Sequence, residues 1–389
     1  MLTSDRQARC EPSDEPLRLM ITGGGTGGHV YPGLAVAEAL RRLEPASRIL
    51  FVGTRAGIEA ELVPRAGFEI AYVRASGFRG LGARARLRFL WNSASGFWGS
   101  LRAIRRFRPD VVLGTGGYVS LPVAAAARLL GVPLALQEQN AVPGSTNRLL
   151  GRWARRVYLG FAEAAVHFRS GLTQDTGNPV REAFLTALPG AGEAGRAVGA
   201  GRPFRLLVFG GSRGARTLNR AAVAAARDWT RSPDMQIRLQ TGRDDLDSVA
   251  RAYEAADHVV VAPYIDDMPE ALAWADLVVS RAGAMTLAEL AAAGKPAVLV
   301  PFPHATDNHQ LRNAKAREEA GAAFLLLDEL CDGGSLAGVV AGLRGDPAGL
   351  SDMADASRAL ARPDAAMKIA TDLMRLSGRL PARGGASVP

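Results

Sequence analysis

The stretch Leu19-Met20-Ile21-Thr22-Gly23-Gly24-Gly25-Thr26-Gly27-Gly28-His29-Val30-Tyr31-Pro32-Gly33 begins as an apolar strand, passes through a run of glycines and enters a helix. Glycine allows backbone conformations and close approaches that a Cβ would block. The following helix offers unpaired N–H groups and the positive end of its dipole to an anion. The stretch therefore predicts a phosphate-binding turn, although tight strand-to-helix turns are also rich in glycine for steric reasons alone. We expect its helix over residues 33–43, with Pro32 in the first turn.

Short apolar runs alternate with helical patterns along the rest of the chain, which predicts βαβ units around parallel sheets. The glycine pattern returns at Phe204–Ala215, so we predict an α/β protein with two Rossmann-like domains. Open α/β sheets bind ligands at the carboxyl ends of their strands, and two such domains would share a central cleft there. The expected strands span residues 18–21, 49–52, 70–73, 111–113, 134–136, 157–159, 204–209, 236–240, 259–262, 277–280, 297–300 and 323–326.

Shifts in composition predict where the domains begin and end. The segment after Ala183 is rich in Ala, Gly and Pro and reads as an interdomain linker. We expect a disordered leader over 1–16, a first domain over 17–186, the linker over 187–202, a second domain over 203–362, a helix over 363–378 that packs back on the first domain, and a tail over 379–389.

Composition limits the class of protein. The chain has 389 residues and a formal net charge of +9, which comes mainly from arginine and favours partners that carry phosphate. The arginines are spread along the sequence, which disfavours a nucleic-acid partner. Cys10 and Cys331 lie far apart, so we predict neither a disulfide framework nor a metal cluster, as in a reducing cytoplasm. Residues 1–16 do not read as a secretory signal, and the uncharged run over 111–127 is too short for a bilayer-spanning helix.

Two common phosphate-binding motifs do not fit the first glycine run. A dinucleotide site needs an acid at the end of the second strand, which here ends Phe51-Val52-Gly53-Thr54. A Walker loop needs Gly-Lys-Ser/Thr, which does not follow. A nucleotide-sugar site, built from turns and helix ends, remains.

Two segments of the second half follow predicted strands. In Ser280–Leu290, small residues would leave amides open to a pyrophosphate, and Glu289 could accept bonds from both ribose hydroxyls. The alternative is a glutamate favoured only by the helix dipole. In Pro301–Leu311, Asp307, Asn308 and Gln310 could bind sugar hydroxyls. His304 and His309 lack the spacing of metal ligands, so we predict no metal site.

The first half adds polar and basic segments. Gln137–Asn140 and Gly114–Tyr118 follow strands and would project toward the cleft, or they are plain loops. Between Gly77 and Arg108, aromatic residues alternate with arginines. This pattern suits the headgroup region of an anionic membrane, and it suits equally a core helix with a solvated basic face.

Together these motifs resemble the MurG family of glycosyltransferases, a GT-B family (family 28). The resemblance runs over nearly the whole chain after the leader. The motifs that carry it are Thr22–Gly33, Gly114–Tyr118, Glu138–Asn140, Gly177–Arg181, Gly210–Ala215, Ile265–Met268, Gly283–Glu289 and Asp307–Gln310.

The resemblance implies a GT-B fold and a hexosyltransferase of peptidoglycan synthesis. Such an enzyme moves N-acetylglucosamine, with inversion, from UDP-N-acetylglucosamine to the 4-hydroxyl of the muramyl sugar of lipid I, forming lipid II. It implies a peripheral protein on the cytoplasmic face of the cell membrane, in contact with anionic lipid and with other cell-wall synthesis proteins. No cofactor is expected. No Asp-x-Asp motif follows a strand, so amides and helix ends would stabilise the departing UDP without a cation.

The resemblance also implies roles for residues. His29 and Glu138 are the catalytic candidates, and His29 is the preferred base because an imidazole titrates near neutral pH. Tyr118 is placed on the acceptor side. Gln137 and Arg213 stand where the family more often has histidine and glutamine, so their side chains receive no role. The residues expected to bind UDP-N-acetylglucosamine are Thr26, Gly27, Gly28, Asn140, Arg181, Ser212, Ile265, Ala284, Met285, Thr286, Leu287, Ala288, Glu289 and Gln310.

Other functions remain open from sequence. A related GT-B enzyme with a diacylglycerol-type acceptor would share the donor site and the basic surface. A non-hydrolysing UDP-N-acetylglucosamine epimerase has a similar fold but needs no apolar basic surface. A non-catalytic scaffold of a cell-wall complex would not need the full set of donor residues.

Overall fold

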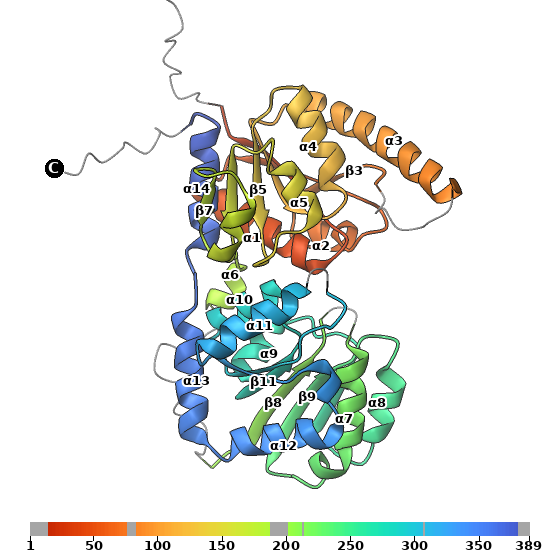
Figure 1. Cartoon of the computed structure of the whole chain (residues 1–389), viewed down its shortest axis with the longest axis vertical. Coiled ribbons are helices and arrows are strands. Elements are labelled where there is room, and N and C mark those ends of the chain that lie inside the picture. Colours follow the sequence, from red (N-terminus) through yellow and green to blue (C-terminus); the bar gives the residue numbers. More distant parts are fainter. Residues whose placement is uncertain (1–14, 76–82, 187–200, 212–213, 306–307, 380–389) are drawn as a thin grey trace, which may run out of the picture. The chain divides into compact units, whose positions relative to one another are not determined.

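The computed structural model describes residues 15–75, 83–186, 201–211, 214–305 and 308–379, with side chains omitted for 83–91 and for Ser93. The chain divides into two compact units. The first comprises Met1–Gln139, Pro143–Thr176 and Asp364–Pro389, and the second Asn140–Val142 and Gly177–Pro363. Each is an α/β unit around a parallel sheet (Figure 1). The predicted α/β class with two parallel sheets is confirmed.

The sheet of the first unit has the strand order β3-β2-β1-β4-β5-β6-β7, and every pairing in it is parallel. Its strands are β1 (Arg18–Gly23), β2 (Arg48–Gly53), β3 (Glu69–Tyr72), β4 (Val111–Gly116), β5 (Leu134–Glu138), β6 (Arg156–Leu159) and β7 (Thr173–Asp175). The central strands β1, β4 and β5 are buried along almost their whole length because helices cover both faces of the sheet.

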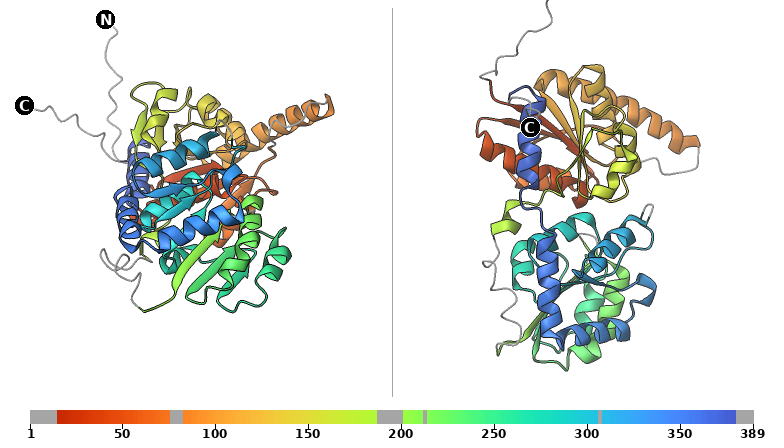
Figure 2. Two further views of the ribbon diagram at one scale, coloured as in Figure 1. Left: turned by 60° about the horizontal axis from the view of Figure 1, so that its bottom comes forward. Right: turned by 60° about the vertical axis from the view of Figure 1, so that its left-hand side comes forward.

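The helices of the first unit form the two covering layers. They are α1 (Gly27–Leu43), α2 (Glu59–Arg65), α3 (Ala83–Phe107), α4 (Ser120–Leu129), α5 (Ser145–Leu150), the 3-10 helix η1 (Ala162–His167) and α14 (Ala365–Leu376). Helices α1 and α14 pack together on one face, and α3 and α4 on the other (Figure 2). Asp372 fastens α14 to β6, because it accepts hydrogen bonds from Tyr158 Oη and Arg156 Nε, both at 3.0 Å.

Helix α1 begins earlier than we predicted. The sequence placed its start at Gly33, whereas the structure starts it at Gly27 and keeps Pro32 inside. The carbonyl of Thr26 accepts bonds from the amides of His29 and Val30, so the first turn is already closed before Pro32. Pro32 then lacks only the bond that its own N–H would have made. The glycine run thus supplies both the turn and the first helical residues.

The second unit has the sheet order β10-β9-β8-β11-β12-β13, again all parallel. Its strands are β8 (Phe204–Phe209), β9 (Met235–Gln240), β10 (Val259–Ala262), β11 (Leu277–Ser280), β12 (Ala297–Leu299) and β13 (Ala323–Leu325). Its helices are α6 (Glu182–Thr186), α7 (Arg216–Trp229), α8 (Leu246–Ala252), α9 (Met268–Trp274), α10 (Ala284–Ala292), α11 (His309–Glu319), η3 (Asp328–Leu330), α12 (Gly333–Arg344) and α13 (Pro347–Ala359).

Candidate functional site

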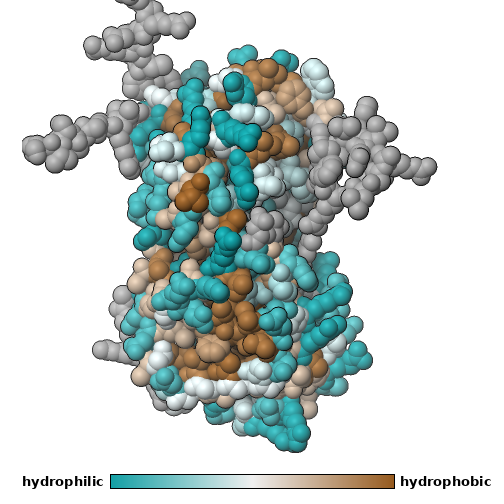
Figure 3. Space-filling view, viewed as in Figure 1, coloured by the Kyte–Doolittle hydropathy of each residue, from teal (hydrophilic) through white to brown (hydrophobic). Residues whose placement is uncertain are grey.

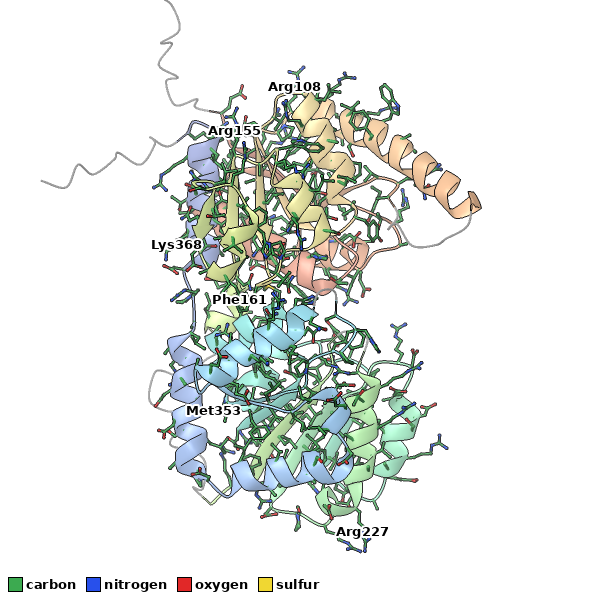
Figure 4. The ribbon with its side chains drawn as sticks, in the orientation of Figure 1. Arg108, Arg155, Phe161, Arg227, Met353 and Lys368 are labelled. Carbon is green, nitrogen blue, oxygen red and sulfur yellow. The ribbon has the colours of Figure 1, made fainter. Side chains whose placement is uncertain are left out.

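The loops that carry the predicted residues follow the carboxyl ends of the strands. In Figure 4, Arg155 and Phe161 mark the two ends of β6, with Phe161 at the carboxyl end. Thr26–His29 lie in the turn after β1 and the start of α1, Tyr118 follows β4, and Glu138 ends β5, with Asn140 two residues beyond it. The parallel sheet therefore gathers the catalytic candidates of the first unit at one edge.

The glycine loop after β1 is held by a carboxylate that the sequence analysis missed. Glu59 Oε2 accepts a hydrogen bond from the amide of Gly25 at 3.0 Å. Glu59 Oε1 accepts from the amide and the hydroxyl of Thr54, both at 2.9 Å. The side chain is only 1% exposed, so it supports the loop and is closed to a ribose. This acid lies six residues beyond the end of β2, outside the position that a dinucleotide motif requires.

His29 lies in the first turn of α1 with its ring turned back to the glycine loop. Its Nδ1 is 3.1 Å from the carbonyl oxygen of Gly24 and 3.3 Å from Thr26 Oγ1. A carbonyl only accepts hydrogen bonds, so this contact requires a proton on Nδ1. In the neutral ring the basic lone pair then belongs to Nε2. The ring edge also passes Gly116, where a Cβ would stand 3.1 Å from Nε2.

Glu138 is buried at the end of β5 and is engaged in positioning the next loop. Its Oε2 accepts bonds from Asn147 Nδ2 at 2.9 Å and from the amide of Gly144 at 3.2 Å. Asn147 also donates to the carbonyl of Gln137 at 3.1 Å, which ties α5 to β5. Tyr118 is partly exposed and lies against Gly25, where a Cβ would stand 3.4 Å from its ring.

The second glycine loop follows β8 and is tightly packed on its inner side. Gly214 has φ +75, and a Cβ there would stand 2.0 Å from the carbonyl oxygen of Thr241. Asn219 in α7 donates to that same carbonyl at 2.8 Å. Gly211 has φ +90, and a Cβ there would have no neighbouring atom within 4 Å, so its surroundings are open. Ser212, the expected pyrophosphate contact, lies outside the described residues.

Gln240 joins this loop to the segment expected to hold the base of the nucleotide. Its Nε2 donates to the carbonyl of Gly211 at 3.0 Å, and its Oε1 accepts from the amide of Ile265 at 2.9 Å. The side chain is buried at the end of β9. Because the amide of Ile265 is engaged, a backbone contact from Ile265 to a ligand would use its carbonyl oxygen. In the sequence Gln240 is one of three polar residues of the alternating strand Met235–Gln240, and burial sets it apart only in the structure.

Helix α10 follows β11 and presents its N-terminus at the same edge of the sheet. Gly283 is the N-cap residue with extended backbone, and the first turn contains no acidic side chain. The predicted residues of this turn are divided by the helix: Ala284, Met285 and Leu287 are buried, whereas Thr286 and Ala288 are partly exposed. The first-turn amides of a helix lack partners within it and favour an anion.

Glu289 lies further along α10. Desolvation raises the pKa of its carboxyl group to about 7, and the positive charge of Arg181 opposes that rise. Arg181 precedes α6, which packs against α10, and its guanidinium carbon lies 5.0 Å from the ring centroid of Phe184. Paired hydroxyl donors would satisfy a carboxylate in this place. The arrangement therefore suits a ribose better than an exposed glutamate would.

Gln310 is in the first turn of α11, and its Oε1 accepts a bond from the amide of Phe302 at 3.0 Å. This hydrogen bond fixes the plane of the side-chain amide of Gln310 and therefore the direction of its Nε2 group. Arg281, between β11 and α10, donates to the carbonyls of Val300 and Pro301 and pairs with Asp328. Arg281 therefore holds the loop after β12 in place.

The structure brings the predicted residues together in two sets, one in each unit. The set of the first unit is Thr26, Gly27, Gly28, His29, Tyr118 and Glu138, and the set of the second is Asn140, Arg181, Ile265, Ala284–Glu289 and Gln310. Among the residues that the structure describes, no group of three or more His, Cys, Asp or Glu side chains is arranged to hold a metal ion.

Comparison with known proteins identifies relatives over most of the chain. The models of the glycosyltransferase family 28 N-terminal and C-terminal domains match residues 19–159 and 205–369. A UDP-N-acetylglucosamine--N-acetylmuramyl-(pentapeptide) pyrophosphoryl-undecaprenol N-acetylglucosamine transferase of Acidithiobacillus ferrooxidans is 46% identical, covering 94% of this chain and 99% of that protein. The enzyme of the same name from Pelobacter propionicus is 44% identical, with coverages of 92% and 99%.

Solved structures of related proteins have the same fold over most of the chain. Acinetobacter baumannii MurG superimposes with a TM-score of 0.71 at 32% identity, covering 92% of this chain and 99% of that one. A UDP-N-acetylglucosamine 2-epimerase superimposes with a TM-score of 0.69 at 14% identity, covering 96% and 100%. At that identity the epimerase shares the fold alone.

Proposed function

The chain belongs to the MurG family of GT-B glycosyltransferases, and on that premise we propose which of its residues carry the reaction. The reaction transfers N-acetylglucosamine from UDP-N-acetylglucosamine to the muramyl sugar of lipid I and forms lipid II. The observation that carries the assignment of residues is the clustering of the predicted side chains at the carboxyl edge of each sheet.

The donor is held mainly by the second unit. We assign the pyrophosphate to the first-turn amides of α10 and to the glycine loop 210–214, and the ribose to Glu289. Gln240 fixes the spacing between that loop and Ile265, which holds the uracil. Thr286 and Gln310 face the diphosphate and the amino sugar. Preorganised amides and a helix end stabilise charge on the departing UDP without the reorganisation that water would need.

The acceptor is activated in the first unit. His29 takes the proton of the attacking 4-hydroxyl through Nε2, since Nδ1 is committed to the carbonyl of Gly24. The carboxylate of Glu138 is committed to Asn147 and Gly144, so its role is to position the loop beside the acceptor. The products of the step are the β-linked disaccharide, UDP and a proton on His29.

The acceptor assay tests this function. Purified protein with UDP-N-acetylglucosamine is expected to release UDP at least 100-fold faster with a lipid I analogue than with diacylglycerol, and to keep that rate in excess EDTA. Equal rates with both acceptors would assign the chain to another glycolipid glycosyltransferase. Loss of activity in EDTA, restored by Mg²⁺, would overturn the assignment of charge stabilisation to amides.

We also propose that the first unit binds an anionic membrane. No helix in the described part of the chain is long and apolar enough to cross a bilayer. Within α3, Leu101 and Ile104 are buried against the sheet, while Trp98 is 66% exposed and Arg102 and Arg105 are solvated. On the face seen in Figure 3, apolar surface of the first unit gathers over α4, which packs beside α3. An exposed indole beside cations is typical of an interfacial anchor.

Trp98→Ser is expected to reduce binding to phosphatidylglycerol vesicles severalfold, because an exposed aromatic anchor contributes on the order of 1–2 kcal/mol when it enters the interface. Co-sedimentation with vesicles measures the bound fraction. Val260→Ser, at an apolar residue of the second unit that is 58% exposed, is the matched control and should leave binding unchanged. Equal loss in both variants, or none in Trp98→Ser, would contradict the assignment of the surface.

A further inference from the structure

The buried carboxylate of Glu59 takes no part in the steps above, yet it contacts the loop that carries His29. It is the first residue of α2 and is 1% exposed. Its two oxygens accept three hydrogen bonds, one from the amide of Gly25 and two from Thr54. A carboxylate with this many neutral donors is satisfied without a cation.

The surroundings of Glu59 are shaped to this carboxylate. A Cβ on Gly24 would stand 2.5 Å from Glu59 Cδ, one on Gly53 would stand 2.5 Å from its Cγ, and one on Gly57 would stand 2.3 Å from Cδ. Real Cβ atoms do not approach that closely. The three glycines therefore allow the backbone to pack directly against the Glu59 side chain on several sides.

The peptide group between Gly24 and Gly25 connects Glu59 to the catalytic histidine. Its N–H, from Gly25, donates to Glu59 Oε2 at 3.0 Å. Its C=O, from Gly24, accepts from His29 Nδ1 at 3.1 Å. One planar amide thus has the carboxylate at one end and the imidazole at the other. Because the amide is rigid, the bond to Glu59 fixes the direction in which the Gly24 carbonyl points.

We propose that Glu59 is a positioning residue that acts through the Gly24–Gly25 peptide to hold His29 in its Nδ1-protonated tautomer, a proposal that rests on His29 being the base. Hydrogen bonds in a chain polarise one another, so the negative charge on Glu59 strengthens the carbonyl as an acceptor for Nδ1–H. If the hydrogen bond from Nδ1–H to the Gly24 carbonyl were lost, the hydroxyl of Thr26, 3.3 Å from Nδ1, would donate to Nδ1 and favour the Nε2–H tautomer. The lone pair would then leave Nε2.

Glu59→Gln tests the relay while preserving the size of the side chain. The amide carries no negative charge in either orientation, so the polarisation of the Gly24 carbonyl is lost, and in one orientation Gly25 loses its acceptor as well. We expect the ¹⁵N signals of His29, in protein labelled at histidine, to change from the Nδ1–H to the Nε2–H pattern. We also expect kcat to fall about 10- to 100-fold, the scale seen when the partner orienting a metal-bound histidine is removed. The KM for UDP-N-acetylglucosamine should stay within twofold.

Asp372→Asn is the matched control, since Asp372 is another buried carboxylate of the first unit and holds α14 to β6. It should lower the melting temperature and leave the His29 tautomer and kcat unchanged. Should Glu59→Gln fail to fold, Glu59→Asp replaces it, because a shorter side chain cannot reach Thr54 and Gly25 together. In the wild-type protein we expect the Nδ1–H tautomer of His29, and this measurement needs no variant.

An Nε2–H tautomer in the wild-type protein, or an unchanged tautomer in folded Glu59→Gln, would overturn the relay. The change of the His29 tautomer in Glu59→Gln tests the role of Glu59 even if turnover does not depend on His29. Failure of the relay is therefore distinguishable from failure of His29 as the base, which substitution of His29 itself measures.

Discussion

Replacement of Glu289 by alanine is expected to lower kcat/KM for UDP-N-acetylglucosamine about 100- to 1,000-fold. The carboxylate would accept two charge-assisted hydrogen bonds from the ribose, each contributing about 1.5–3 kcal/mol. Isothermal titration calorimetry with UDP-N-acetylglucosamine and steady-state kinetics measure the loss. Because the ribose does not react, KM and the dissociation constant should rise more than kcat falls. An unchanged dissociation constant would remove Glu289 from the donor site.

The same residue predicts how donor affinity depends on pH. The carboxyl of the free protein has a pKa raised to about 7 by desolvation, and only the ionised form accepts both hydroxyls. Donor affinity should therefore rise with pH up to about 7 and level off above it. Glu254→Ala, at an exposed carboxylate of the same unit, should keep this profile. Glu289→Gln should flatten it.

Proton linkage gives the matching result for stability. The pKa of Glu289 is raised from 4.5 to about 7, so the folded protein binds more protons than the unfolded chain between these values. The contribution of Glu289 to the free energy of unfolding then falls as the pH rises from about 4.5 to about 7. Without the donor, Glu289→Gln should be the more stable protein at pH 8.

Periodicity was enough to predict the fold because the strands of the two cores carry runs of apolar residues, or alternate them with polar ones as β9 does. The strand predicted at 259–262 is β10 and that at 277–280 is β11, each with the same bounds. β7 was missed. Its residues Thr173–Asp175 are three polar positions at the edge of the sheet, and their backbone pairing with β6 leaves no hydrophobic signal in the sequence.

Candidate site residues could be predicted where a characteristic side chain follows a strand. Residues whose side chains hydrogen-bond to the main chain of a distant loop could not be predicted. Glu289 and His29 could be named as candidates because they follow strands in recognisable patterns. Glu59 and Gln240 were missed, because their partners are main-chain groups of segments distant in sequence. Such contacts depend on the conformation of the loops. Because almost every residue has the same backbone amide and carbonyl, the sequence does not show which of them a side chain will bind.

The choice between His29 and Glu138 as the base depends on what each group is already bound to. Glu138 accepts from Asn147 and Gly144 and so holds the start of α5. His29 uses Nδ1 for the carbonyl of Gly24, which places the basic lone pair on the other nitrogen. Both donors bind the same oxygen, Oε2, so the amide oxygen of Glu138→Gln can still accept from both, and the effect of this variant on turnover should be small.

His29→Ala is expected to reduce kcat about 100- to 10,000-fold, the range that a positioned general base contributes. The dissociation constant for UDP-N-acetylglucosamine should stay within about twofold, because the residues assigned to the donor lie mainly in the second unit. His167→Ala, at an exposed histidine of the first unit, is the matched control and should turn over at the wild-type rate. Rapid-quench measurement of a single turnover separates the chemical step from product release. A single-turnover rate equal to that of the wild type would show that another group accepts the proton.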